Sequence, residues 1–370
     1  MRLSSLILSL GFLLATTSVH ADEKAKPALL SEKEIADGWL LLFDGETTFG
    51  WTGKAEVKDG VMQIPKGESV TYKVALPVGE MIFEAADCEV GVRSASPSAQ
   101  GASNKVSSVG WRKVTVKRSQ TGNKVDTAIL SESVGVNSQS IRSEAGDNAV
   151  GTWNFDLSAG ENAGQVKPIK FRPAAEVKLF NGKDLSGWKV FAGDLKRVAT
   201  KFDVTKDGEL HAVNGPGDLQ TEKTFDNFLL QIECKTNGVA LNSGIFFRCL
   251  PDQYQSGYEM QIQNAIIGDD RTKPLDYGTG AIYRRIAARK VVSNDKEWFA
   301  MSLLAHGAQF ATWVNGYSVV SWTDDRKPDD NARKGMKLGK GHLSIQGHDP
   351  TTDLLFRNMR IVELDAAKRE

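Results

Sequence analysis

Polar side chains recur at every second position of residues 257–263, a stretch whose pattern predicts a β-strand. Alternate residues of a strand share a face, so Glu259, Gln261 and Gln263 are expected on one side of a sheet. Carboxyl and amide groups form hydrogen bonds, and a carboxyl group can also transfer a proton. This face is therefore either an ordinary solvated surface or the floor of a site for a hydroxyl-rich ligand.

A second polar row is expected in residues 342–348. Ser344, Gln346 and His348 alternate with two apolar residues, so they should share the outer face of another strand. Histidine titrates near neutral pH and is the side chain most often used as a general base. His348 and Glu259 are thus the two candidate acid–base groups, and the sequence leaves open which of them takes a proton.

Residues 242–248 and 278–283 are expected to be strands or loops of the same antiparallel sheet. Asn242 and Arg248 should share a face, and Gly244 between them leaves room above the strand. A guanidinium group at Arg248 could hold the carboxyl group of Glu259 ionised.

Several other chemistries lack their sequence signatures. No Gly-x-Ser-x-Gly segment indicates a serine hydrolase, no glycine-rich loop indicates a phosphate site, and no Cys/His spacing indicates a zinc site. Gln261 and Gln263 stand two and four residues after Glu259, which argues against glycoside hydrolysis by two carboxylates on one strand. Asp269 and Asp270 could bind a hard cation but are more simply explained as a loop, so a requirement for a divalent metal ion stays open.

The composition bears on the possible partners and on the fold class. Lys+Arg and Asp+Glu both number 46 among 370 residues, and this balance gives no preference for nucleic acid or an acidic membrane surface. Glycine is frequent, with 35 residues, and short alternating runs outnumber helical patterns, which predicts an all-β protein. The three cysteines, an odd number, do not indicate a disulfide framework, and Cys234 and Cys249 are interpreted as small core residues.

The first 21 residues have the pattern of a secretory signal peptide. Arg2 precedes an apolar run from Leu6 to Ala15, and small residues end at Ala21. The run is too short to span a bilayer. We therefore expect cleavage after Ala21, export to the periplasm or the cell exterior, a polar leader over residues 22–37, and no membrane span in the mature chain.

Two parts of the chain repeat the same order of motifs, which indicates an internal duplication. Residues 39–51 and 177–188 each contain an apolar strand, an Asx-Gly turn and a Gly-Trp pair, and both copies end alike. We predict a shorter, degenerate N-terminal β-sandwich over residues 38–172, a linker over 173–176, and a C-terminal β-sandwich over 177–366. The polar rows all belong to the second copy, so the site is expected there.

Residues 176–365 resemble the 3-keto-disaccharide hydrolase family, also described as 3-keto-glucoside lyases and 3-keto-2-hydroxy-glucal hydratases. The resemblance depends on ordered segments at residues 179–182, 187–188, 242–248, 257–262, 280–283, 297–298, 313–316, 346–348 and 356–358. It implies a concanavalin A-like β-sandwich, so with the duplication we expect an all-β chain of two tandem jelly-roll domains. Family members often carry Asp where this chain has Gln263, so no metal or base role is assigned there.

The resemblance also implies a chemistry. A ketone at C3 of a sugar acidifies the proton on C2; a base removes it, the C1 substituent leaves by β-elimination, and water adds to the glucal. We expect His348 and Glu259 to share the acid and base roles, and Arg248 to stabilise the oxyanion. The hydroxyl groups of a 3-keto-glycoside or disaccharide would be held by Asn242, Gln261, Gln263, Gln346 and Tyr283. The competing interpretation is a non-catalytic, lectin-like carbohydrate-binding protein.

Overall fold

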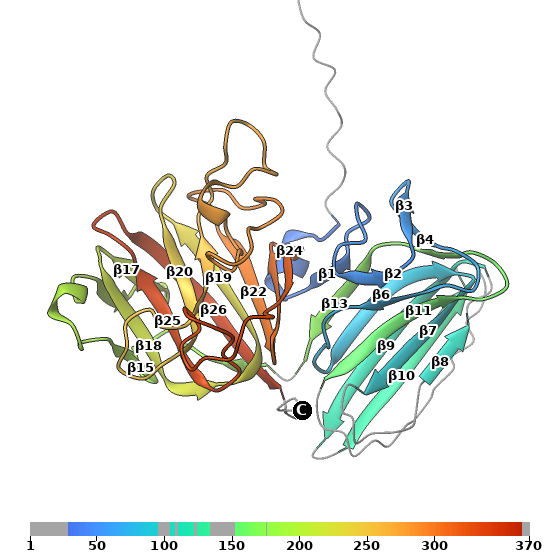
Figure 1. Ribbon diagram of the computed structural model, residues 1–370, viewed down its shortest axis with the longest axis horizontal. Helices are drawn as coiled ribbons and strands as arrows, with labels where there is room; N and C mark the ends of the chain where they lie inside the picture. The colour runs from blue at the N-terminus through green and yellow to red at the C-terminus, as the bar shows by residue number, and fades with distance from the viewer. Residues whose placement is uncertain are drawn as a thin grey trace, which may run out of the picture.

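The computed structural model describes residues 29–94, 104–107, 110–121, 124–133, 152–174 and 176–364. Within these residues the chain forms two tandem β-sandwiches, each with an eight-stranded and a five-stranded antiparallel sheet (Figure 1). The predicted fold class, all-β with two tandem concanavalin A-like sandwiches, is confirmed. The predicted signal peptide and residues 22–28 of the leader lie outside the described residues.

The first sandwich is built from the following strands: β1 (Leu40–Phe43), β2 (Trp51–Gly53), β3 (Glu56–Lys58), β4 (Val61–Ile64), β5 (Ser69–Tyr72), β6 (Gly79–Ala86), β7 (Cys88–Ser94), β8 (Asn104–Ser107), β9 (Arg112–Thr121), β10 (Lys124–Ser133), β11 (Trp153–Ala159), β12 (Gly164–Val166) and β13 (Ile169–Pro173). Its eight-stranded sheet has the order β1-β13-β6-β12-β4-β3, with β9 pairing β6 and β10 pairing β9. Its five-stranded sheet has the order β2-β5-β11-β7-β8.

The second sandwich is built from the following strands: β14 (Val177–Lys178), β15 (Trp188–Val190), β16 (Lys201–Val204), β17 (Leu210–Val213), β18 (Gly217–Phe225), β19 (Asn227–Thr236), β20 (Ser243–Cys249), β21 (Tyr258–Ile262), β22 (Phe299–His306), β23 (Gln309–Val314), β24 (Tyr317–Thr323), β25 (Gly341–Gly347) and β26 (Asp353–Leu364). Its eight-stranded sheet has the order β16-β17-β26-β19-β22-β23-β24, with β14 pairing β26. Its five-stranded sheet has the order β15-β18-β25-β20-β21.

The two sandwiches repeat each other strand by strand. The order β2-β5-β11-β7-β8 in the first corresponds to β15-β18-β25-β20-β21 in the second. The repeat extends to side chains, since the Trp51 indole donates to the carbonyl of Leu42 at 2.8 Å and the Trp188 indole donates to the carbonyl of Leu179 at 3.2 Å. The first copy is shorter in sequence, but within the described residues its two sheets have the same numbers of strands as those of the second.

Apolar side chains at alternate positions fix which way each strand faces. In the five-stranded sheet of the second sandwich, Leu219, Ile245, Met260 and Ile345 are at most 2% exposed and belong to one hydrophobic core. Burying an aliphatic side chain contributes about 1.5–3 kcal/mol, and a slip of one residue would turn the whole row outward. The residues between them must therefore point away from the core.

The two sandwiches meet along an apolar seam, with β1 next to β24 (Figure 1). Leu304 and Trp313, on the outer face of the eight-stranded sheet of the second sandwich, belong to the same buried cluster as the core of the first. The Trp313 indole donates to the carbonyl of Leu41 at 3.0 Å, and Arg289 forms a buried ion pair with Asp44. The seam therefore joins the sandwiches by packing, hydrogen bonds and charge.

The remaining elements are short. Helix α1 (Glu32–Ala36) starts with a capping box between Ser31 and Glu34, and η1 (Leu195–Arg197) and η2 (Leu275–Tyr277) are single 3-10 turns. Cys88, Cys234 and Cys249 are buried and form no disulfide, as expected for small core residues. Among the described residues, no helix has the length and apolar character needed to cross a membrane.

Candidate active site

One face of the five-stranded sheet of the second sandwich collects polar side chains. Its residues alternate with the core residues of β18, β20, β21 and β25, so they point away from the core. The ladder pairs Asp218 with Gln346 and Gly244 with Gln261, while Phe246 lies between Ser344 and Glu259. We call this surface the polar face, and it comprises Asp218, Gln220, Gly244, Phe246, Glu259, Gln261, Ser344 and Gln346.

Glu259 is a buried carboxyl group paired with an arginine. Its side chain is 4% exposed, and its Oε2 accepts a hydrogen bond from Nη2 of Arg333 at 3.1 Å. Burial raises the pKa of Glu259 to about 7; Arg333 lowers the pKa, and the negative charges of Asp276 and Asp218 raise it. Gly244 makes room for this side chain, because a Cβ there would lie 2.7 Å from Glu259 Oε1. Both protonation states are thus populated near neutral pH, as an acid–base group requires.

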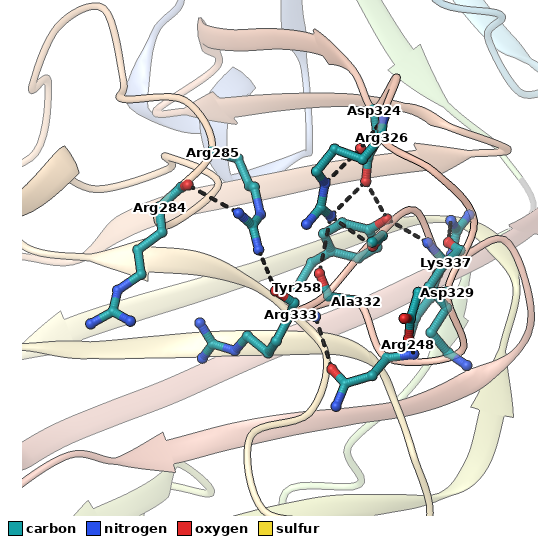
Figure 2. A network of polar contacts seen from close by, with 12 residues as sticks. Arg248, Tyr258, Arg284, Arg285, Asp324, Arg326, Asp329, Ala332, Arg333 and Lys337 are labelled. Carbon is teal, nitrogen blue, oxygen red and sulfur yellow. Dashed lines mark hydrogen bonds and ion pairs between the residues drawn. The ribbon is translucent and has the colours of Figure 1, made fainter.

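Arg333 comes from the loop between β24 and β25, and three contacts hold it over the polar face. Its guanidinium group lies over the ring of Phe246, 4.9 Å from the centroid, and its Nε donates to the carbonyl of Gln255 at 3.0 Å. Its own carbonyl accepts a hydrogen bond from Nη2 of Arg285 at 2.8 Å (Figure 2). A positive charge therefore stays next to Glu259 while the carboxyl group titrates.

The loop that carries Arg333 is anchored by a network of its own (Figure 2). Nη2 of Arg326 binds the carboxylate of Asp324 at 2.8 Å and donates to the carbonyl oxygens of Ala332 and Gly335 at 3.0 and 2.8 Å. The hydroxyl of Tyr258, on the core side of β21, donates to the same carboxylate at 2.7 Å. The core thus fixes the path of the loop and the position of Arg333.

Asp218 supplies a second carboxyl group that the sequence reasoning missed. It is 0% exposed, and its Oδ2 accepts a hydrogen bond from the backbone N–H of Gln255 at 3.3 Å. Burial raises the pKa of Asp218 to about 7, although the Gln255 N–H, the Ser344 hydroxyl and the charge of Arg197 lower it. The β21 strand itself carries no second carboxylate, as predicted, and Asp218 comes from β18, which β25 and β20 separate from β21 in the sheet. The alternation of the strand could have indicated Asp218, because it precedes the core residue Leu219 and must therefore point away from the core.

Four buried oxygens of the polar face have no well-formed hydrogen bond within the protein: Asp218 Oδ1, Gln261 Oε1, Gln346 Oε1 and Ser344 Oγ. The Ser344 hydroxyl is close enough to Asp218 to lower its pKa but lacks full hydrogen-bond geometry. Buried polar groups are nearly always paired, and an unpaired one costs about 1–3 kcal/mol. Their gathering on one face marks a place where a ligand with hydroxyl groups would complete the bonding.

Asn242 and Gln261 meet at one side of the polar face. Nε2 of Gln261 donates to Asn242 Oδ1 at 3.3 Å and to Asp276 Oδ2 at 3.2 Å, and Nδ2 of Asn242 donates to Asp276 at 3.0 Å. Tyr283 lies next to β21, since its backbone N–H donates to the carbonyl of Glu259 at 2.9 Å. These predicted ligand-binding residues therefore lie together, and the carboxylate of Asp276, from the 3-10 turn η2, joins two of them.

Gln263 has a different place from the one predicted. It is 5% exposed, its Oε1 accepts from the N–H of Ala265 at 3.0 Å, and its Nε2 donates to the carbonyl of Ala240 at 3.3 Å. Both ends of the amide are used by backbone groups, so Gln263 supports the loops and is not assigned to ligand binding.

Arg248 does not belong to the polar face, contrary to the prediction. A register shift between β20 and β25 and a left-handed backbone at Arg248, with φ 54°, break the simple alternation. Its guanidinium group is 0% exposed and donates to the carbonyl oxygens of Asp226, Gly307 and Lys337 at 3.1, 2.7 and 2.7 Å. Arg248 thus joins three loops at one end of the sandwich, and the predicted oxyanion-stabilising role is withdrawn.

His348 lies just beyond the end of β25, two residues after Gln346. Its side chain is 39% exposed, and its Nδ1 is 2.8 Å from Oδ2 of Asp349. The structure therefore places His348 at the rim of the polar face, where the sheet ends, and brings Glu259, Gln261 and Gln346 onto the face itself.

No group of three or more His, Cys, Asp or Glu side chains is arranged to hold a metal ion within the part of the chain that the structure describes. Asp270 accepts hydrogen bonds from Thr272 and forms an ion pair with Lys273 at 3.1 Å. The structure assigns no ligands to the metal ion that the sequence left open.

Solved structures with similarity to this chain match about half of it. A protein of Parabacteroides distasonis, provisionally described as a glycosyl hydrolase, is 26% identical, with a TM-score of 0.41 over 51% of this chain and 94% of its own. A carbohydrate-binding module from Bacillus subtilis is 14% identical, with a TM-score of 0.34 over 47% and 93%. A β-glucanase of Bacillus licheniformis is 13% identical, with a TM-score of 0.36 over 51% and 97%.

Among proteins with curated functions, none matches this sequence. Residues 175–362, just over half of the chain, match the family described as the 3-keto-alpha-glucoside-1,2-lyase-like domain. This match contains the whole polar face and confirms the resemblance seen in the sequence. The chain is therefore a carbohydrate-active protein that belongs to the 3-keto-alpha-glucoside-1,2-lyase-like family.

Proposed function

We propose that the second sandwich cleaves 3-keto-glycosides by removing the proton on C2, with Glu259 as the base. The observation that carries the proposal is a buried carboxyl group with a pKa of about 7, beside Arg333 and among unpartnered hydrogen-bonding oxygens. A base with a pKa near the working pH combines an adequate ionised fraction with an adequate affinity for the proton.

The reaction proceeds by elimination and hydration. Ionised Glu259 takes the C2 proton, the electron pair of the C2–H bond forms a C2–C3 double bond, and the C3 carbonyl becomes an enolate. The enolate then re-forms the ketone as the C1–O bond breaks, which releases the aglycone oxygen and leaves a C1–C2 double bond. Water adds across that double bond, so the sum of the steps is hydrolysis.

Two groups compete for the role of acid toward the leaving oxygen. Asp218 lies on the polar face, and its negative charge is one of the causes that raise the pKa of Glu259. His348 lies at the rim and is exposed. We assign the acid role to Asp218 because it is buried beside the unpartnered oxygens, and keep His348 as the alternative.

Substrate hydroxyl groups are held by the amides of the face. Gln346 Oε1 and Gln261 Oε1 are buried acceptors without partners, suited to the hydroxyl donors of a sugar. Asn242 and Tyr283 border the same area, and we assign Arg333, which lies beside Glu259, the role of stabilising the enolate oxygen.

The experiment compares Glu259→Gln, Asp218→Asn and His348→Ala on p-nitrophenyl 3-keto-glucoside. Glu259→Gln is expected to lower kcat/KM by at least about 100-fold, in the range of general-base removal. Glu233→Gln is the matched control, because Glu233 is also buried and paired with an arginine but lies on β19 in the other sheet. Full activity in Glu259→Gln, or no exchange of the C2 hydrogen with deuterated solvent in the wild type, would reject the mechanism.

Ordinary glycoside hydrolysis by two carboxylates is the second candidate, and the presence of Asp218 and Glu259 on one face favours it. It predicts turnover of the unoxidised glucoside, whereas elimination requires the C3 ketone. A lectin-like function would appear as sugar binding with no turnover of either substrate.

We also propose export of the mature chain to the periplasm or the cell exterior, on the strength of the N-terminal pattern in the sequence. N-terminal sequencing of the mature protein is expected to begin at Asp22, and an intact N-terminus in the cytoplasmic fraction would contradict it.

A further inference from the structure

A groove lies on the first sandwich, beside its junction with the second sandwich. Its volume is about 610 Å³, within the range of pockets that hold small ligands. The lining side chains are mostly hydrogen-bonding groups and come from both sandwiches: Thr52, Thr71, Lys73, Arg93, Asn154 and Gln309. Gln309 belongs to β23 of the second sandwich, so the seam holds both sides of the groove in place.

This groove lies over the five-stranded sheet that corresponds to the one carrying the polar face. By strand order, β5, β11 and β7 occupy the places of β18, β25 and β20. Asp156 of β11 pairs with Thr71 and Gly91, as Gln346 of β25 pairs with Asp218. The core residues of β11 are Trp153, Phe155 and Leu157, so Asn154 and Asp156 face outward.

The two faces share a local arrangement of glycine, carboxylate and arginine. In the second sandwich a Cβ at Gly244 would meet the carboxyl group of Glu259, which is paired with Arg333. In the first, a Cβ at Gly91 would overlap the carboxyl group of Asp156, which is 8% exposed and binds Nη2 of Arg93 at 2.7 Å. Both sheets therefore place a buried carboxylate over a glycine on the same face, although Asp156 comes from β11, at the place of β25, and Glu259 comes from β21.

We propose that this groove is a second carbohydrate-binding site, which holds an oligosaccharide without cleaving it. Hydroxyl, amide and guanidinium groups match the alternating donors and acceptors of a sugar ring. Asp156 forms an ion pair with Arg93, and its role in this proposal is to orient the guanidinium group toward the ligand. The choice of ligand class rests on the carbohydrate chemistry proposed for the second sandwich.

The test uses the full chain with Glu259→Gln, so that no substrate is consumed, titrated calorimetrically with maltohexaose, cellohexaose and laminarihexaose. Adding Asn154→Ala and Gln309→Ala together is expected to weaken binding at one site by about tenfold or more, because each loses a hydrogen bond to the ligand. Gln63→Ala is the matched control, since Gln63 lines a different groove on the same sandwich. In an otherwise wild-type chain the double variant should keep its kcat on p-nitrophenyl 3-keto-glucoside.

Two results would overturn the proposal: no saturable binding of any of the three hexasaccharides, or equal affinity in the double variant and the Gln63→Ala control. The catalytic proposal fails by a different result, namely full turnover of the 3-keto-glucoside by Glu259→Gln. Loss of binding at the groove with unchanged turnover supports the second site whatever the mechanism at the first.

Discussion

Glu259 should make the protein less stable as the pH rises, and replacing it with a residue that does not titrate should abolish this contribution. The folded protein holds the proton of Glu259 up to a pKa of about 7, against 4.5 for an unburied glutamate. The folded state thus binds more protons than the unfolded state between these values. The stability contributed by this group is fully present below about pH 4.5 and is lost as the pH rises through about 7.

The size of the effect follows from the same shift. A pKa shift of one unit corresponds to about 1.36 kcal/mol, so the rise of the Glu259 pKa from 4.5 to about 7 corresponds to about 3 kcal/mol. Glu259→Gln cannot titrate, and its free energy of unfolding relative to the wild type should increase by about 3 kcal/mol between about pH 4 and pH 8. The variant is therefore expected to be inactive and, at alkaline pH, more stable than the wild type.

The assay is urea unfolding followed by tryptophan fluorescence at several pH values, for the wild type, Glu259→Gln and Gln346→Ala. The last variant lies on the same face but removes a group that does not titrate, so its difference from the wild type should not depend on pH. A Glu259→Gln difference that stays constant within about 1 kcal/mol over this range would refute the reasoning, because it would mean that burial does not raise the pKa of Glu259.

Three other predictions test the placement of single residues. Gly244→Ala should lower kcat/KM by about tenfold or more, because the new Cβ displaces the carboxyl group of Glu259; Gly339→Ala, where a Cβ meets nothing within 4 Å, should leave the rate unchanged. Arg248→Met should lower the free energy of unfolding by about 3 kcal/mol or more, since three carbonyl groups lose their donor. A variant of unchanged stability with a hundredfold lower kcat would instead indicate that Arg248 has a catalytic role. Asp44→Asn should remove the carboxylate partner of Arg289 in the seam, while Ser318 and Thr47 still accept from Arg289, and should cost about 1.5–3 kcal/mol; calorimetry is expected to show the two sandwiches unfolding at separate temperatures, and a single unshifted transition would contradict this.

The polar rows were predictable because their information is local. Side chains alternate between the two faces of a strand, so Glu259 and Gln261 share one face of their strand, and Ser344 and Gln346 share one face of theirs. This holds whatever the fold of the rest of the chain. The turn at Asn315-Gly316 was predictable for a similar reason, since both residues adopt the positive φ that such a hairpin needs. Repetition of motifs revealed the duplication without any coordinates.

Arg248 shows where local reasoning ends. A single residue with a left-handed backbone and a register shift took its side chain off the predicted face, and no pattern in residues 242–248 signals that change. Arg333 comes from a loop and Asp276 from the 3-10 turn η2, neither of which has a strand pattern, so their approach to the polar face depends on how those segments are anchored.

The sequence by itself determined that this chain is a duplicated, all-β protein and that one sheet of its second half carries outward amides and a carboxyl group, because alternation and turn chemistry act over a few residues. Only the tertiary structure decided that Asp218 joins Glu259, that Arg333 and not Arg248 supplies the nearby charge, and that both carboxyl groups titrate near neutral pH. Proton affinity depends on burial and on charges distant in sequence, and these exist only once the sheets have assembled.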